Sequence, residues 1–166
     1  MSSIGNSNLL YNTESILRGK GAFVVLIKTE WNQAVVDELE TGCLRICKVE
    51  GIIAETITVP GAVEIPFAVQ HYWHSVKQKK RPDAFIAFGC VVRGGTPHFE
   101  YVCQSVTSGI TLLNTQLPVP VIFGVLTVNN NEEALERVGG VHGHKGEEAA
   151  ITAAKMIALS RQINKG

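Results

Sequence analysis

Residues 83–103, DAFIAFGCVVRGGTPHFEYVC, decide how this chain folds. The segment 83–92 is an almost continuous apolar run, which is typical of a strand buried on both faces of a parallel sheet. Arg93, two glycines, a threonine and a proline follow, and from residue 99 to residue 113 apolar side chains recur at helical spacing. The stretch therefore predicts a strand, a tight loop and a helix in direct succession.

The same succession recurs before and after this stretch. Runs of β-branched and other apolar residues predict further strands at residues 21–29, 55–60 and 119–128. Helical spacing predicts helices at residues 31–51, 64–80, 131–139 and 145–163. Strands that alternate with helices in this way are typical of an α/β fold with a parallel sheet. We therefore expect a single-domain three-layer sandwich, in which four parallel strands have helices on both faces.

The composition excludes several classes of function. The chain has 15 basic and 15 acidic residues, and we interpret its short basic run at 77–81 as a solvated helix end, so we expect no nucleic-acid partner. No stretch reaches the roughly 20 apolar residues that a membrane span needs, and the first residues lack the pattern of a signal peptide. The four cysteines form no Cys-x-x-Cys pair, so we expect reduced thiols in a cytoplasmic protein.

The loop after residue 92 combines features that suit an anion. In a parallel sheet, ligands bind at the carboxyl ends of the strands. Gly94 and Gly95 would let backbone amides approach a ligand at the start of a helix. Thr96 is predicted as the N-cap and Pro97 as the first helical residue, which places His98 in the first turn, where a neutral imidazole would suit proton transfer. A plain tight turn with a surface histidine is an equally good interpretation of this loop alone.

Trp31 and Glu64, which lie near predicted strand ends, have two interpretations each. Trp31 is either part of the core or a pocket wall whose flat ring would stack on a heterocycle. Glu64 is either an ordinary carboxylate at a helix N-terminus or an acceptor of hydrogen bonds from a polyol. Arg137 and Lys145, each taken alone, are typical of solvated charges.

No motif for a metal ion or a nucleotide is complete. The segment GGVHGHKGEE lacks the glycine before Lys145 and the serine or threonine after it that a Walker loop requires. The spacings of His71 with His74 and of His142 with His144 are not completed by a Cys, Asp or Glu set, so we expect no metal site.

Taken together, five segments resemble the lumazine synthase family (6,7-dimethyl-8-ribityllumazine synthase). They are TEWN, TVPGAVEIPFA, GCVVRGGTPHFEYVC, PVIFGVLT and ERVGGVHGHKG, and they follow one another in the family's order. The resemblance implies a flavodoxin-like domain at residues 21–166, preceded by an N-terminal arm at residues 1–20 that could add a strand to a neighbour's sheet. Two positions depart from the common pattern: Glu30 stands where the family usually has arginine, and Trp31 stands where many members have phenylalanine.

The resemblance implies a transferase of riboflavin biosynthesis. Such an enzyme condenses 5-amino-6-(D-ribitylamino)uracil with 3,4-dihydroxy-2-butanone 4-phosphate, through an imine, loss of phosphate and ring closure, without a metal or an organic cofactor. Members of the family form pentameric rings, and some pack twelve rings into an icosahedron of sixty subunits. The resemblance leaves open which assembly this chain forms and whether riboflavin synthase is a partner.

The resemblance also implies three groups of site residues. His98 would be the catalytic residue that moves protons. The aminopyrimidine and its ribityl chain would contact Trp31, Asn32, Ala62, Val63, Glu64, Val91, Val92, Phe123 and Lys145. The butanone phosphate would contact Gly95, Thr96 and Arg137. Phe123, Arg137 and Lys145 would belong to the neighbouring subunit, and no role is implied for Arg93.

Three other functions are compatible with the same fold. One is the archaeal type of riboflavin synthase, against which the segment RGGTPHFEYVC argues. Another is a flavin-binding module that uses Trp31 without catalysis, and the third is a shell protein. An assay of phosphate release from the two substrates separates the enzyme from the last two.

Overall fold

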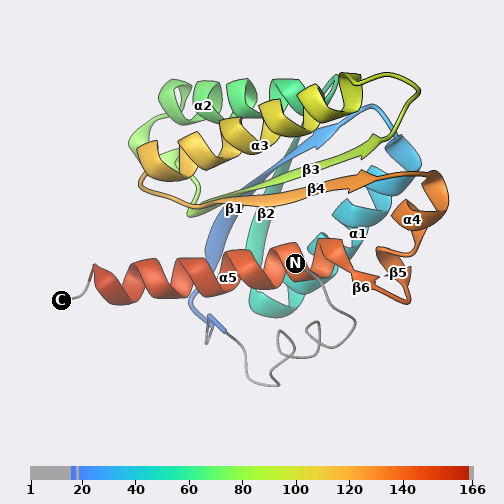
Figure 1. Ribbon diagram of the computed structural model, residues 1–166. Helices are drawn as coiled ribbons and strands as arrows, with labels where there is room; N and C mark the ends of the chain where they lie inside the picture. Colours follow the sequence, from blue (N-terminus) through green and yellow to red (C-terminus); the bar gives the residue numbers. More distant parts are fainter. Residues whose placement is uncertain (1–15, 18, 165–166) are drawn as a thin grey trace.

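The computed structural model describes residues 16–17 and 19–164 and has a central sheet of four parallel strands between two layers of helices (Figure 1). The strands are β1 (Ala22–Thr29), β2 (Ile52–Val59), β3 (Ala84–Val92) and β4 (Val121–Val128), in the spatial order β2-β1-β3-β4. The two central strands, β1 and β3, are the continuous apolar runs, and almost all of their residues are buried, as expected for strands covered on both faces. The predicted α/β class and the three-layer sandwich are confirmed.

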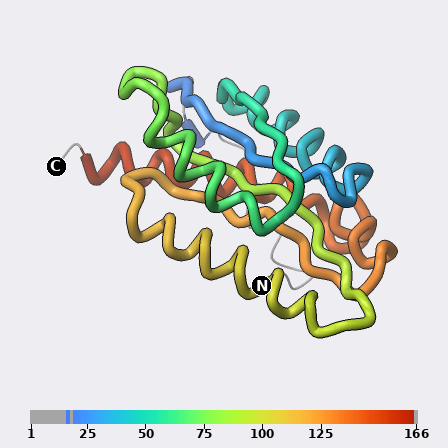
Figure 2. Tube along the Cα trace, turned by 90° about the horizontal axis from the view of Figure 1, so that it is seen from above, coloured from blue at the N-terminus to red at the C-terminus, as the bar shows by residue number. Residues whose placement is uncertain are grey.

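Two pairs of helices cover the two faces of the sheet. The helices are α1 (Gln33–Glu50), α2 (Ile65–Ser75), α3 (His98–Gln116), the short α4 (Asn131–Leu135) and α5 (Lys145–Ile163), with 3-10 turns η2 (Ala62–Glu64) and η3 (Gln78–Lys80). Figures 1 and 2 show α2 and α3 together on one face, while α1 and α5 lie on the other. The sheet thus separates two cores, with Leu26 and Phe88 facing α1 and α5, and Ile27 and Phe85 facing α2 and α3. Among the described helices, none is long and apolar enough to cross a membrane.

Several predicted boundaries were wrong: helix α3 runs to Gln116 rather than 113, β4 begins at Val121 rather than 119, and two others have a physical reason. Strand β2 begins at Ile52 rather than at residue 55, because it pairs with β1 in register along its whole length, from Ala22 with Ile52 to Thr29 with Val59. Helix α2 ends at Ser75, so the basic run at 77–81 is not its end but contains the separate turn η3. Residues 77–80 carry no apolar side chain that could pack on the sheet, and a helix is not extended without such packing.

The predicted helix at residues 131–139 is wrong beyond Leu135. The chain instead forms a small antiparallel hairpin of β5 (Val138–Gly140) and β6 (Gly143–His144). Gly139 and Gly143 have φ angles of 119° and 75°, a region that glycine enters without steric cost. The hairpin brings together two residues that are apart in sequence: the Lys145 amide donates to the Arg137 carbonyl oxygen at 2.8 Å.

The predicted N-terminal arm lies largely outside the described residues, as does the strand that it was expected to add to a neighbour's sheet. Its described part includes Ile16 and Leu17, whose amides donate to the Glu50 carboxylate at 3.2 and 3.1 Å. Glu50 is the last residue of α1 and is buried. The chain therefore enters the domain along the carboxyl end of α1.

Candidate functional site

A cavity of about 640 Å³ lies at the carboxyl ends of β1, β2 and β3. Its lining includes most of the predicted substrate residues: Trp31, Asn32, Ala62, Val63, Glu64, Val91, Val92, Thr96 and His98. These residues come from three loops that are far apart in sequence. They meet because parallel strands present their carboxyl ends at the same edge of the sheet. The volume is in the range of sites for small molecules.

Trp31 forms an exposed wall of this cavity, and Asn32 holds its backbone in place. The indole is 71% exposed, so the core interpretation of Trp31 is wrong. Asn32 has a φ of 57°, a left-handed conformation that asparagine tolerates better than most residues. Its side-chain amide donates to the Cys90 carbonyl oxygen at 2.7 Å, which ties the start of α1 to β3. The result is a flat, exposed ring beside the cavity, on a backbone that is held at the start of α1.

The segment after β2 contributes backbone and one carboxylate. Residues 62–64 form the 3-10 turn η2, which the Glu64 amide closes by donating to the Gly61 carbonyl oxygen at 3.3 Å. Among the described residues, none donates a hydrogen bond to the exposed Glu64 carboxylate. Its oxygens are therefore available to the hydroxyl groups of a ligand in the cavity.

The loop between β3 and α3 places His98 as the first residue of its helix. The prediction of Thr96 as the N-cap is wrong, because Pro97 occupies the cap position with helical backbone angles and no side-chain cap bond. The turn is closed by the Glu100 amide, which donates to the Pro97 carbonyl oxygen at 3.1 Å. Thr96 is instead one of the residues that line the cavity.

The two glycines of this loop are needed neither for backbone angles nor for packing within the chain. Both Gly94 and Gly95 lack a positive φ, and an added Cβ would meet nothing within 4 Å at either position. Gly94 lines the cavity, whereas Gly95, the predicted phosphate contact, is exposed and is not among the lining residues. The open space in front of these glycines is where a ligand could approach the backbone.

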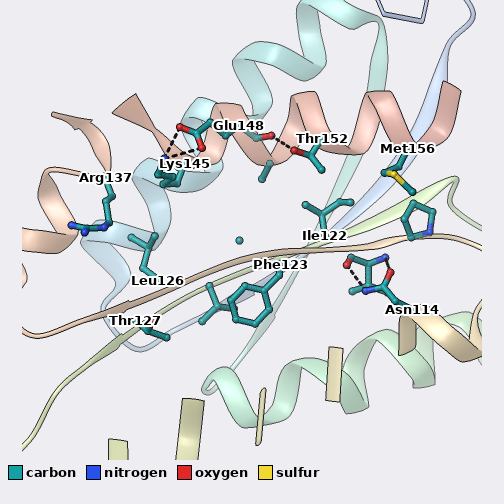
Figure 3. Close-up of a pocket in the computed structure, with 15 residues that line it drawn as sticks. Asn114, Ile122, Phe123, Leu126, Thr127, Arg137, Lys145, Glu148, Thr152 and Met156 are labelled. Carbon is teal, nitrogen blue, oxygen red and sulfur yellow. Dashed lines mark hydrogen bonds and ion pairs between the residues drawn. The ribbon is translucent and has the colours of Figure 1, made fainter. Parts of the chain in front are cut away.

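A second cavity, of about 630 Å³, lies between β4 and α5 and contains the remaining predicted residues, Phe123, Arg137 and Lys145 (Figure 3). The Arg137 guanidinium donates through Nη1 to the Glu133 carbonyl oxygen at 2.5 Å. The Lys145 ammonium pairs with the Glu148 carboxylate at 2.7 Å. Figure 3 shows Arg137 and Lys145 at one end of the cavity and Met156 at the other. The Arg137 and Lys145 side chains thus lie at the same end of the cavity, because the β5-β6 hairpin joins the backbones of these two residues.

The two cavities have no lining residue in common. One chain therefore brings His98 together with Trp31 and Glu64, but it does not bring His98 to Arg137 or Lys145. Strand β4, which lines the second cavity, is an edge strand of the described sheet.

Arg93 is a residue that the sequence analysis left without a role, and it has several partners. Its Nε donates to Asn129 Oδ1 at 3.2 Å, its Nη1 donates to the Glu100 carboxylate, and its Cζ lies 4.2 Å from the centroid of the Phe99 ring. The hydrogen bond from Arg93 lowers the pKa of Glu100 below its usual value. In the sequence, the contact between Arg93 and Glu100 could have been suspected only from an arginine and a glutamate that stand on either side of a glycine loop.

His144 is a buried histidine whose ring lies against α1. Its ring contacts the Gly42 backbone, and neither ring nitrogen has a hydrogen-bond partner in the described structure. Burial is the main cause that lowers the pKa of His144. Within residues 16–17 and 19–164, no three His, Cys, Asp or Glu side chains gather in a way that could hold a metal ion.

Comparison with known proteins agrees with this geometry. A family model described as 6,7-dimethyl-8-ribityllumazine synthase matches residues 21–161. The chain is 45% identical over 154 residues to the 6,7-dimethyl-8-ribityllumazine synthase of Porphyromonas gingivalis, covering 91% of this chain and 93% of that protein. It is 41% identical over 143 residues to the enzyme of the same name from Bacteroides fragilis, covering 84% and 97%. It is 43% identical over 136 residues to that of Cytophaga hutchinsonii, covering 80% and 83%. The chain therefore belongs to the 6,7-dimethyl-8-ribityllumazine synthase family.

Proposed function

We propose that this chain condenses 5-amino-6-(D-ribitylamino)uracil with 3,4-dihydroxy-2-butanone 4-phosphate to 6,7-dimethyl-8-ribityllumazine and releases phosphate. The observation that carries the proposal is the first cavity, where the Trp31 ring, the Glu64 carboxylate and the His98 imidazole surround one space. The family to which the chain belongs bears the name of this reaction.

The cavity offers a separate place to each part of the pyrimidine substrate. The exposed indole of Trp31 is a flat apolar surface on which a heterocycle can stack. The turn at residues 62–64 lies nearby with the free carboxylate of Glu64, which can accept hydrogen bonds from the ribityl hydroxyl groups. Val91 and Val92, at the end of β3, border the ring.

The loop at residues 94–98 serves the second substrate. Thr96 can donate its hydroxyl hydrogen to a phosphate oxygen, and the open backbone at Gly94 and Gly95 lets amides approach the same group. The pyrimidine amine attacks the ketone, and water leaves to form an imine. His98 then accepts a proton from the carbon skeleton as the phosphate departs, and it returns a proton during ring closure, in which a second water is lost. Most of the rate increase comes from holding two reactants together.

The complete site is formed by two subunits. Phe123, Arg137 and Lys145 lie in a cavity that shares no lining residue with the first one, which supports a neighbour as the source of these residues at the His98 site. A ring of five chains uses such heterologous contacts, in which one face of each chain meets a different face of the next. Arg137 of the neighbour would then bind the phosphate together with Gly95 and Thr96.

The larger assembly and the location are also part of the proposal. In the described sheet, β2 pairs only with β1, so its outer edge can accept a strand from a neighbour's N-terminal arm. Pentamers could remain single or assemble into sixty subunits, and riboflavin synthase is the candidate partner in either case. The four thiols at Cys43, Cys47, Cys90 and Cys103 are free, which supports a cytoplasmic location.

The decisive experiment supplies both substrates to the purified protein and follows phosphate release and lumazine formation together. We expect the two products in equal amounts, with no added metal. A protein that binds riboflavin through Trp31 but releases no phosphate would instead be a flavin-binding module, and the proposal would be wrong. Shells without either product would indicate encapsulation as the function.

A further inference from the structure

The segment at residues 94–96 has little to hold its shape. No hydrogen bond within the described part of the chain involves Gly94, Gly95 or Thr96. Two of these residues are glycines, which have more backbone freedom than any other residue. A loop that must place a phosphate group and a histidine within a few tenths of an ångström needs its two ends to be fixed.

Arg93 is bound to both ends of this loop. Its backbone amide donates to the Val128 carbonyl oxygen at 2.9 Å, so the loop leaves β3 from a fixed point on β4. Its side chain reaches over the loop to the first turn of α3, where it stacks on Phe99 and pairs with Glu100. The same guanidinium is held from the other side by Asn129, the first residue after β4.

We propose that Arg93 is a positioning residue for the reaction: its guanidinium fastens the first turn of α3 to the segment after β4, and thereby sets where Thr96 and His98 lie in the cavity. This inference rests on the proposed function. Arg93 is not among the residues that line either cavity, so it acts through the loop and not on the substrate.

The shape of arginine is what this role requires. A planar guanidinium can stack on a ring through its face and donate to two acceptors through its edge, whereas a lysine ammonium is a single point of charge. The Arg93 and Glu100 side chains are both about half exposed, and such a pair contributes little to stability. Its effect should therefore be seen in catalysis rather than in the melting temperature.

Another explanation is that Arg93 acts by its positive charge, attracting the phosphate directly. The two explanations make opposite predictions for two variants. If the positive charge of Arg93 attracts the phosphate, Arg93→Lys should behave like the parent. Glu100→Ala should then lower the KM for the butanone phosphate, because it removes a nearby negative charge. If position matters, both variants should impair the use of this substrate, because each one releases the first turn of α3.

The test measures kcat and the KM of each substrate for the parent, Arg93→Met, Arg93→Lys and Glu100→Ala. We expect kcat/KM for the butanone phosphate to fall about 10- to 100-fold in both Arg93 variants and in the same direction in Glu100→Ala. The KM for the pyrimidine should stay within about twofold of the parent value, because Trp31 and Glu64 are held by other loops. Inhibition by inorganic phosphate, a probe of the phosphate site without the rest of the substrate, should weaken in parallel.

Arg45→Met is the matched control, since Arg45 is also an exposed arginine paired with a glutamate, Glu147, at 3.0 Å. It should keep the parent's kinetic constants. Full activity in Arg93→Lys, or a lowered KM in Glu100→Ala, would overturn the proposal, and so would equal rises in the KM values of the two substrates. If Arg93→Met does not fold, the other two variants still decide. A parent protein without activity would contradict the proposed function instead.

Discussion

The division of the predicted site residues between two cavities leads to a quantitative test of a shared site. His98 lies at the first cavity and Arg137 at the second, and the two cavities share no residue. In a ring, each boundary would then combine His98 of one chain with Arg137 of the next. The experiment co-expresses, in equal amounts, chains that carry His98→Ala and chains that carry Arg137→Ala.

The pure variants should both be weak. Without its proton-transferring group, His98→Ala should lose roughly 10- to 100-fold in kcat. In the described structure, Arg137 uses Nη1 on the Glu133 carbonyl oxygen, which leaves its other guanidinium hydrogens for the phosphate. Losing such charged hydrogen bonds should cost about 2 kcal/mol, or roughly 30-fold in KM for the butanone phosphate.

Mixed rings should recover activity that neither variant has. A boundary is complete when its His98 comes from an Arg137→Ala chain and its Arg137 comes from a His98→Ala chain. With random mixing, each condition has even odds, so about one quarter of the boundaries should be complete. The mixture should show about a quarter of the parent activity, well above the mean of the two pure variants.

The assay is lumazine formation by rings whose mixed composition is verified by mass spectrometry. A control mixes parent chains with the double variant His98→Ala/Arg137→Ala. Shared sites should again leave about one quarter of the boundaries complete, whereas sites built within one chain should leave about one half. A first mixture with only the mean activity of the pure variants, together with one half in the control, would refute the shared site.

Three further predictions concern single residues. Burial lowers the pKa of His144, so the imidazole binds a proton more readily in the unfolded chain than in the folded one. We therefore expect the melting temperature to fall as the pH drops below about 6.5, the usual pKa of histidine. The fall should be smaller in His144→Gln. In Gly146→Ala, the new Cβ would lie 2.0 Å from the Leu39 carbonyl oxygen. The free energy of unfolding, measured with denaturant, should therefore fall by about 3 kcal/mol. Gly94→Ala is the control and should keep the parent stability, because nothing lies near its Cβ. Riboflavin should quench the fluorescence of exposed Trp31 and leave the buried Trp73 unaffected, so equal quenching in Trp31→Ala would rule out stacking on that ring.

The sequence alone predicted the order of the main strands and helices, and it did so for a physical reason. Burial on both faces makes β1 and β3 continuous apolar runs, and burial on one face gives the long helices their spacing. These are local patterns, so they can be seen before any contact is known. The same patterns placed Trp31, Glu64 and His98 after strand ends, and the structure brings these three residues to one cavity.

Which elements meet, and how the short segments fold, could not be predicted from local patterns, because both depend on contacts between distant parts of the chain. The full length of β2 depends on its register with β1. The hairpin after Leu135, which joins Arg137 to Lys145, is too short for any periodic signal. Strand order and packing, rather than local sequence, set the distance between Arg137 and His98. The same holds for the contacts of Arg93 with Asn129 and Glu100.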